Sequence, residues 1–357
     1  MRVAVVCGLS DDKLLSKIKP LMVSPQIREI HIIRREPLSG SKITSWTPPG
    51  LWSRTTLTAE LYRLFFLLYF CWRNKPDLLI GYFFVPHGVY VGLAGWLFGI
   101  PVAQMILGSD LDLYLNSRWL FWLLRQADFV GVRGKNTRRA LIARSVLAEK
   151  LFIPPNVFDF GDFYPQQMPF EYDLIYVGNF SRDKRIDVLI QVVTRLKSRF
   201  PNLRVALIGS GELAKTLQAE VARAGLSESV VFLGYKSKTE VRDHLNRSRV
   251  FIMTSEAEGL PMALIEAMSC GLPAIVPDVG NITDVAQDGV NALAVPALDV
   301  DAFVHAVTRL LTDDALYRRL AGQALKIRET LAEQYSLADA ERVWASVLER
   351  VMFKPNG

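Results

Sequence analysis

Short apolar runs alternate with longer amphipathic stretches from the first residue of the chain. Runs of this kind, unbroken by charge, are typical of parallel strands that are buried on both faces. In the first half they lie at residues 3–7, 30–33, 78–82, 102–107 and 129–132. The stretches between them have the periodicity of covering helices, so the pattern predicts a doubly wound parallel sheet.

A break in the alternation divides the chain in two. Residues 153–156 read Ile-Pro-Pro-Asn, and residues 159–169 are rich in Pro, Gly, Asp and Gln, which is typical of a linker. The alternation then restarts, with strands predicted at 172–177, 205–208, 230–233, 250–253, 274–276 and 292–295. We therefore expect domains at 1–165 and 166–335, with a ligand cleft between the carboxyl ends of their strands. Residues 337–351 predict a terminal amphipathic helix.

Composition agrees with a two-domain α/β protein. The chain has 357 residues, of which 50% are hydrophobic and 22% charged, and its mean hydropathy is positive. The net charge of +6 is uneven: residues 1–165 hold 20 Lys and Arg against 12 Asp and Glu (+8), and the remainder 22 against 24 (−2). A basic first half indicates an anionic partner surface there. No feature of the sequence indicates a nucleic-acid partner.

Targeting and redox features indicate a cytoplasmic protein. The N-terminus reads as a strand rather than a signal peptide, and three widely spaced cysteines favour neither disulfides nor a zinc site. Residues 78–109 carry no Asp, Glu, Lys or Arg. Because Gly and Pro interrupt this stretch repeatedly, we interpret it as strand, helix and strand rather than a membrane span.

The most informative segment is S-E-A-E-G-L-P-M-A-L-I-E-A-M-S-C-G-L-P, residues 255–273. Pro261 suits the first position of a helix, and Gly271 suits the position just past its end. Glu258 then lies on the entering loop and Glu266 inside the helix. A loop with Gly259, Leu260 and Pro261 at a helix N-terminus favours an anion site. The alternative is a pair of ordinary solvated glutamates.

This pattern resembles the E-x7-E signature of the retaining family-4 glycosyltransferases, which have the GT-B fold. The resemblance implies two Rossmann-like domains facing across a cleft, with a C-terminal helix, 336–357, that crosses back to the first domain. It implies that Glu258 contacts the donor sugar and Glu266 the ribose of the nucleotide. It also implies that the backbone from Gly259 to Met262, including Leu260 and Pro261, approaches the sugar and diphosphate.

Residues 176–184, Y-V-G-N-F-S-R-D-K, end one predicted strand and open a helix. Gly178 permits a tight turn, and Arg182 and Lys184 offer cations for a diphosphate. The family usually reads G-R-L-x-x-x-K-G here, so Lys184 matches and Asn179 replaces the family arginine. Arg182 is a candidate replacement, and an ordinary solvated helix start is the alternative.

Further junctions complete the implied donor site. Gly209 lies at a strand–helix junction that borders the nucleotide in the family, and Tyr235 follows the segment that reads the base. Tyr235 is predicted either to stack on the base or to fill space. Gly8 ends the first strand at the rim of the cleft.

The first half carries the acceptor candidates. Asp110 follows a predicted strand in Leu-Gly-Ser-Asp, where family members often have His-Gly-Ser-Asp, so a histidine-assisted step is excluded there. Asp110 is expected to orient the acceptor hydroxyl or the sugar, or to cap a helix. His87 is interpreted as a packed or turn histidine.

Aromatic and basic residues interleave in the first half. For Phe65–Phe70 the spacing favours a helix that covers the sheet. For 119–125, with Arg138 and Arg139, it favours contact with an anionic membrane.

Together these features predict a cytoplasmic, peripheral, metal-independent retaining hexosyltransferase without a cofactor. Its donor is expected to be a UDP- or GDP-sugar, and its acceptor a saccharide or lipid-linked saccharide in surface polysaccharide synthesis. A sugar-nucleotide epimerase of the same fold and a non-catalytic nucleotide-sugar-binding protein remain as alternatives.

Overall fold

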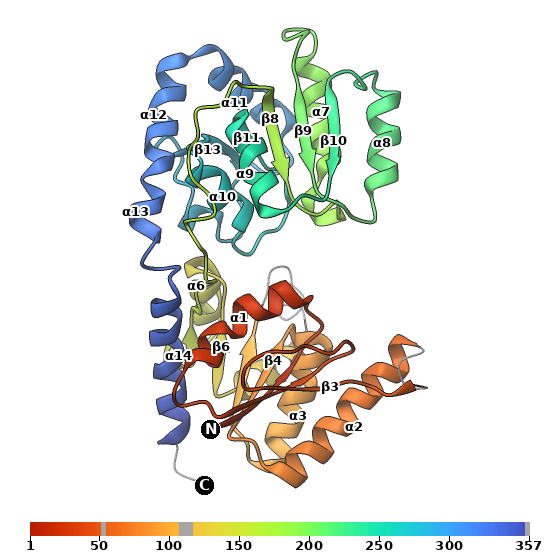
Figure 1. Cartoon of the computed structure of the whole chain (residues 1–357), viewed down its shortest axis with the longest axis vertical. Coiled ribbons are helices and arrows are strands. Elements are labelled where there is room, and N and C mark those ends of the chain that lie inside the picture. The colour runs from red at the N-terminus through yellow and green to blue at the C-terminus, as the bar shows by residue number, and fades with distance from the viewer. Residues whose placement is uncertain (51–54, 107–116, 354–357) are drawn as a thin grey trace. The chain divides into compact units, whose positions relative to one another are not determined.

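The computed structural model describes residues 1–50, 55–106 and 117–353. The chain forms two compact units (Figure 1). Unit 1 is Met1–Phe158 with Glu333–Gly357, and unit 2 is Asp159–Ala332. The divisions lie a few residues before those expected at 165 and 335.

Unit 1 contains a parallel sheet in the order β3-β2-β1-β4-β5-β6-β7. Its strands are β1 (Arg2–Val6), β2 (Glu29–Ile33), β3 (Ile43–Trp46), β4 (Leu78–Tyr82), β5 (Val102–Met105), β6 (Phe129–Gly131) and β7 (Leu151–Phe152). The predicted strands are confirmed within one or two residues. β3 and β7 were missed because β3 carries polar residues among its four and β7 has only two.

Alternate side chains of β1 enter two different cores, as the period of a strand requires. Val3 and Val5 pack with α1 (Asp11–Val23) and α14 (Leu337–Met352). Ala4 and Val6 pack on the opposite face. That face is covered by α2 (Thr56–Asn74), α3 (Val89–Phe98), α5 (Arg118–Gln126) and α6 (Lys135–Ala143). The predicted terminal helix is confirmed: as α14 it packs on α1 and buries Trp344 in unit 1.

Unit 2 contains a second parallel sheet in the order β10-β9-β8-β11-β12-β13. Its strands are β8 (Tyr172–Val177), β9 (Val205–Ile208), β10 (Val230–Gly234), β11 (Ser248–Ile252), β12 (Ala274–Pro277) and β13 (Ala292–Val295). The helices are α7 (Ile186–Leu196), α8 (Ala214–Arg223), α9 (Lys238–Asn246), α10 (Met262–Ser269), α11 (Val300–Thr312), α12 (Asp314–Leu325) and α13 (Ile327–Leu331). The largest core of this unit joins one sheet face to α7, α8 and α11.

Both sheets reverse their strand order next to the first strand of the unit. In unit 1 this switch point lies between β1 and β4, and in unit 2 between β8 and β11. Loops after the two strands at a switch point diverge to opposite faces of the sheet, which leaves a crevice where ligands of such folds bind. In unit 2 the two loops are the segments after β8 and after β11.

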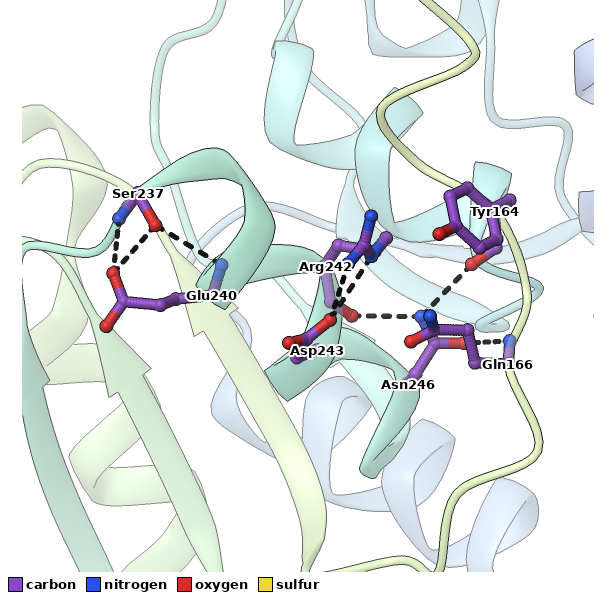
Figure 2. A network of polar contacts seen from close by, with 7 residues as sticks. All are labelled: Tyr164, Gln166, Ser237, Glu240, Arg242, Asp243 and Asn246. Atoms are coloured by element: carbon purple, nitrogen blue, oxygen red, sulfur yellow. Dashed lines mark hydrogen bonds and ion pairs between the residues drawn. The ribbon is translucent and has the colours of Figure 1, made fainter.

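The predicted linker is held on unit 2 by α9 (Figure 2). The Asn246 side chain accepts a hydrogen bond from Gln166 N at 2.6 Å and donates one to the Tyr164 carbonyl at 3.1 Å. The Arg242 guanidinium lies 4.7 Å from the centre of the Tyr164 ring. The start of unit 2 is therefore fixed beside α9.

The uncharged stretch of unit 1 is built as predicted. Its described part forms β4, a turn, α3 and β5, with Gly99 in the left-handed region (φ 66°) just after α3. In the described part of the chain, no helix is both long enough and apolar enough to span a membrane.

Candidate functional site

An ion pair joins the two loops at the switch point of unit 2. Lys184 Nζ lies 2.8 Å from Glu258 Oε1, and the Ser255 hydroxyl donates to the same oxygen at 2.8 Å. The Glu258 side chain is only 7% exposed, so its carboxylate depends on these partners in place of water. The pKa of Lys184 is raised, because the attraction of Glu258 and Asp183 outweighs the opposing effect of burial.

Backbone contacts fix the same two loops to each other. Thr254 Oγ1 donates to the carbonyls of Lys184 and Arg185, at 3.2 and 2.9 Å. Glu256 N donates to the Asp183 carbonyl at 2.9 Å. The Lys184–Glu258 pair is thus held by the backbone on both sides and does not depend on side-chain placement alone.

Lys184 lies in a short 3-10 turn, Arg182–Lys184, ahead of α7. The expectation that it begins the helix is wrong, because Arg185 adopts a left-handed conformation (φ 47°) and separates the turn from α7. Arg185 is held there by ion pairs to Asp187 at 2.9 Å and Glu256 at 3.0 Å. The Ser181 hydroxyl donates a hydrogen bond to Asp183 Oδ1 at 2.6 Å, which completes the turn.

Glycines allow the neighbouring junctions to approach closely. Gly209 has φ 144°, and a Cβ there would lie 1.8 Å from the Gly178 carbonyl oxygen. Gly280 has φ 59°, and a Cβ there would lie 1.8 Å from the Glu258 carbonyl oxygen. The loops after β8, β9, β11 and β12 therefore pack backbone against backbone around the ion pair.

The second glutamate of the motif lies on α10. Pro261 is the N-cap residue of α10 rather than its first helical residue, as had been expected, and Gly271 follows the helix end with φ 87°. Leu260 and Pro261 are buried, while Gly259 and Met262 are half-buried. The loop into α10 is thus anchored by apolar packing, and its backbone forms the helix N-terminus beside Glu258.

Glu266 is half-buried and stands in a different environment from Glu258. Burial raises its pKa to about 7; the nearby Asp162 carboxylate adds to this rise, and Lys238 opposes it. Asp162 and Lys238 themselves form an ion pair at 2.8 Å. Among the described residues, no hydrogen-bond partner of the Glu266 carboxylate is found, which leaves it available to hydroxyl donors.

Three other candidates are exposed. Arg182, Asn179 and Tyr235 lie at the surface of unit 2, and Tyr235 has 79% of its area exposed directly after Gly234 (φ 71°). Within the described ranges, Arg182 makes no ion pair. Its replacement of the family arginine stays a prediction, as does stacking by Tyr235.

Two candidates belong to the first half. Gly8 lies in unit 1, after β1, where a Cβ would lie 3.0 Å from His87 Cε1. His87 is buried, and burial and Arg63 lower its pKa to about 4, so the ring is neutral between Arg63 Nη1 (2.8 Å) and the Tyr82 carbonyl (3.1 Å). Asp110 lies outside the described residues.

Sequence reasoning did not assign roles to Thr254, Ser255, Asp183, Arg185 or the Asp162–Lys238 pair. Ser and Thr are ordinary loop residues, and no spacing rule connects position 184 with 254. The described part of the chain also contains no group of three His, Cys, Asp or Glu side chains that is suited to hold a metal ion.

The arrangement presents a cation and a carboxylate side by side, with a second carboxylate on α10. A sugar phosphate has the complementary polarity, because its phosphate is anionic and its sugar hydroxyls are hydrogen-bond donors. Two units that each contain a doubly wound parallel sheet, with the terminal helix packed on the first unit, are characteristic of the GT-B class of glycosyltransferases.

Comparisons with known proteins agree. Residues 167–327 match the family model "Glycosyl transferases group 1". The matched stretch makes up most of unit 2, and the resemblance to these glycosyltransferases drawn from the sequence is confirmed. An N-acetyl-alpha-D-glucosaminyl L-malate synthase of Bacillus anthracis is 25% identical over 74% of this chain and 72% of its own length. The amylovoran biosynthesis glycosyltransferase AmsK of Erwinia amylovora is 26% identical, over 50% of this chain and 44% of its own length.

Solved structures share the fold over almost the whole chain. The Anabaena Alr3699/HepE structure with UDP and glucose superposes with a TM-score of 0.77, at 16% identity over 98% of this chain and 99% of that one. The lipopolysaccharide outer core galactosyltransferase WaaB gives a TM-score of 0.69 at 18% identity, over 99% of both chains. These similarities confirm the predicted GT-B fold.

Proposed function

We propose that this protein transfers a hexose, with retention of configuration, from a nucleoside diphosphate sugar to an acceptor hydroxyl in polysaccharide synthesis. The observation that carries the proposal is the Lys184–Glu258 pair at the switch point of unit 2. Structural relatives with UDP and glucose or with UDP-glucose support the donor class.

The roles follow from charge and position. Lys184 and the N-terminus of α10 stabilise negative charge on the leaving nucleoside diphosphate, so no metal ion is required. Glu258 accepts hydrogen bonds from the donor sugar and orients it. Glu266 accepts hydrogen bonds from the ribose, while Arg182, Asn179, Gly178, Gly209 and Tyr235 border the nucleotide. Gly8 borders the donor from the first half of the chain, and Asp110 orients the acceptor hydroxyl or the sugar.

The acceptor proposed is a saccharide, carried on a lipid, at the cytoplasmic face of a membrane. A row of exposed apolar side chains on unit 1 supports contact with the bilayer. We call it the aromatic face, and it comprises Leu57, Leu61, Phe65, Tyr69 and Trp72 of α2, Leu93, Trp96 and Leu97 of α3, and Trp119 and Trp122 of α5. Exposed Arg118, Arg125 and Arg139 supply charge that complements anionic headgroups.

The test is release of free nucleotide from UDP- and GDP-sugars, with and without saccharide acceptors, before and after EDTA. We expect release only with an acceptor, insensitive to EDTA, and a product anomer that NMR shows to have the configuration of the donor. Lys184→Gln should slow release by about 10²–10³-fold, as loss of one preorganised charge-stabilising donor does. Lys215→Gln, an exposed lysine of α8, is the matched control and should leave the rate unchanged.

The alternatives give different results. Release or isomerisation of the sugar without any acceptor would mark an epimerase. Binding of the nucleotide sugar without turnover under any condition would mark a sensor, and either result would overturn the transferase proposal.

A further inference from the structure

Two cations of unit 1 converge on one neutral oxygen. Lys17, from α1, donates to Asn156 Oδ1 at 3.1 Å, and Arg133, just after β6, donates to the same atom at 2.6 Å. Both cations are half-buried, and Asn156 is buried. An amide oxygen satisfies hydrogen bonds but neutralises neither charge.

These side chains line a small cavity at the carboxyl edge of the sheet. Its wall includes Tyr82, Met105 and Gly131, which are the last residues of β4, β5 and β6. The space at its centre is roughly that of one water molecule, so it accommodates one oxygen atom of a larger oxyanion and excludes a sugar ring. The cavity thus lies at the edge of the sheet where ligands of this fold bind.

Among the residues that the structure describes, no counter-charge is paired with either cation. In residues 1–50, 55–106 and 117–353, no carboxylate forms an ion pair with Lys17 or Arg133. Burial lowers the pKa of Lys17 to about 6, and repulsion from Arg133 and from Lys13 on the same helix adds to this effect. Burial also lowers the pKa of Arg133, opposed by the hydroxyls of Tyr82 and Tyr335.

An uncompensated pair of half-buried cations is unfavourable, and a bound anion relieves it. We propose that Lys17, Arg133 and Asn156 form a binding site for one oxyanion, a phosphate or carboxylate group of a ligand. The assignment of that group to the acceptor rests on the transferase function proposed above, whereas the oxyanion site itself does not. The acceptor is then acidic, and this contact selects it.

Anion binding is coupled to protonation of Lys17, so the affinity of the site for an anion should depend on pH. An anion favours charged Lys17, so binding above pH 6 takes up a proton, and affinity falls by up to about tenfold per pH unit. Lys184 behaves differently, because its raised pKa keeps it charged throughout this range. Sulfate is a suitable probe since it does not titrate between pH 5.5 and 8.5.

The experiment is calorimetric titration of the whole chain with sodium sulfate from pH 5.5 to 8.5, at constant ionic strength. We expect affinity to fall with pH above about 6, with proton uptake measured in buffers of different ionisation enthalpy. Lys17→Met should abolish the pH dependence and the proton uptake. Arg133→Gln should weaken binding at every pH, and Lys19→Met, an exposed lysine of the same helix, should change nothing.

Inorganic phosphate and malonate, added as competitors of sulfate at pH 6, show whether the site prefers a phosphate group or a carboxylate group. The one that displaces sulfate more strongly identifies the group, and displacement by neither overturns the proposal. Equal sulfate binding by wild type and Lys17→Met at every pH also overturns it, and this comparison is secure because removal of a half-buried charge should not unfold the protein. A further outcome is sulfate binding that shows the expected pH dependence while no nucleotide is released in the presence of an acceptor. This combination would reject the transferase function and the assignment of the oxyanion to an acceptor, and it would leave the oxyanion site itself supported.

Discussion

At the scale of single residues, the two glutamates of one motif differ because their surroundings differ. Glu258 is paired with Lys184 and Ser255, which hold it in a fixed orientation as a charged acceptor. Glu266 has lost water without gaining an equivalent partner, and its pKa rises to about 7. The spacing of the motif is visible in the sequence, but this difference is not.

The raised pKa of Glu266 predicts how nucleotide binding depends on pH. The ionised carboxylate is the better acceptor for ribose hydroxyls, so affinity should rise with pH to about 7 and then level off. Below that pH it should fall by up to about tenfold per unit. Thermal shift or calorimetry with UDP and GDP at pH 5.5–8.5 measures this.

Glu266→Gln should remove the pH dependence and weaken nucleotide binding, whereas Glu228→Gln, an exposed glutamate of the same unit, should have no effect.

The effect of pH on folding stability through Glu266 has the opposite sign to its effect on nucleotide binding. A carboxyl whose folded pKa lies above its unfolded value of 4.5 is stabilising when protonated, so its contribution is lost as pH rises through about 7. Without nucleotide, Glu266→Gln should therefore melt higher than wild type at pH 8.

At the scale of elements, strands were predicted well and the loops between them were not. β8, β9 and β13 match the predicted ranges because apolar runs of this length are buried on both faces. The turn around Lys184 was predicted as the start of a helix, and the left-handed Arg185 that ends it has no sequence signal apart from its position. One of its two ion pairs is made with Glu256, a residue of another loop.

Close packing of the loops predicts a large effect of a single methyl group. Gly209→Ala would place Cβ 1.8 Å from the Gly178 carbonyl, at φ 144°. We expect it to destabilise unit 2 by more than about 2 kcal/mol, as strain at a special backbone position does, and to abolish the nucleotide-induced thermal shift. Urea unfolding measures the first effect.

Gly322→Ala is the matched control, because this glycine lies within α12 and a Cβ there meets no atom within 4 Å. It should stabilise the unit by about 0.5–1 kcal/mol through helix propensity. Comparable stability of the two alanine variants would contradict the role assigned to the loop contacts.

At the scale of the whole molecule, the aromatic face extends over three helices that pack side by side on unit 1. α2 contacts α3 and α3 contacts α5, and Figure 1 shows α2 and α3 adjacent on the sheet. The prediction that Phe65–Phe70 lie in a helix that covers the sheet is confirmed, but this helix also has an exposed apolar side. Leu67 and Phe70 are buried, but Phe65 and Tyr69 are 61% and 55% exposed.

This face predicts binding to anionic vesicles. Replacing Trp96 and Trp122 together by Ser should lower the bound fraction in vesicle flotation at least tenfold, since each indole contributes its apolar area at the interface. Salt at 1 M, where the screening length is about 3 Å, should weaken binding to anionic vesicles. Tyr235→Ser, an exposed aromatic residue of unit 2, is the control. Equal binding to neutral and anionic vesicles would contradict the charge contribution.

The sequence by itself determined the two parallel sheets, the break between them, the terminal helix and the resemblance to a family. It did so because burial on both faces, helix periodicity and glycine punctuation are local properties that neighbouring residues share. Only the tertiary structure decided that Lys184 and Ser255 meet Glu258, that Glu266 is desolvated beside Asp162, and that Lys17 and Arg133 share one oxygen. These contacts join residues far apart in the chain, and their energies depend on burial and distance, which no short pattern encodes.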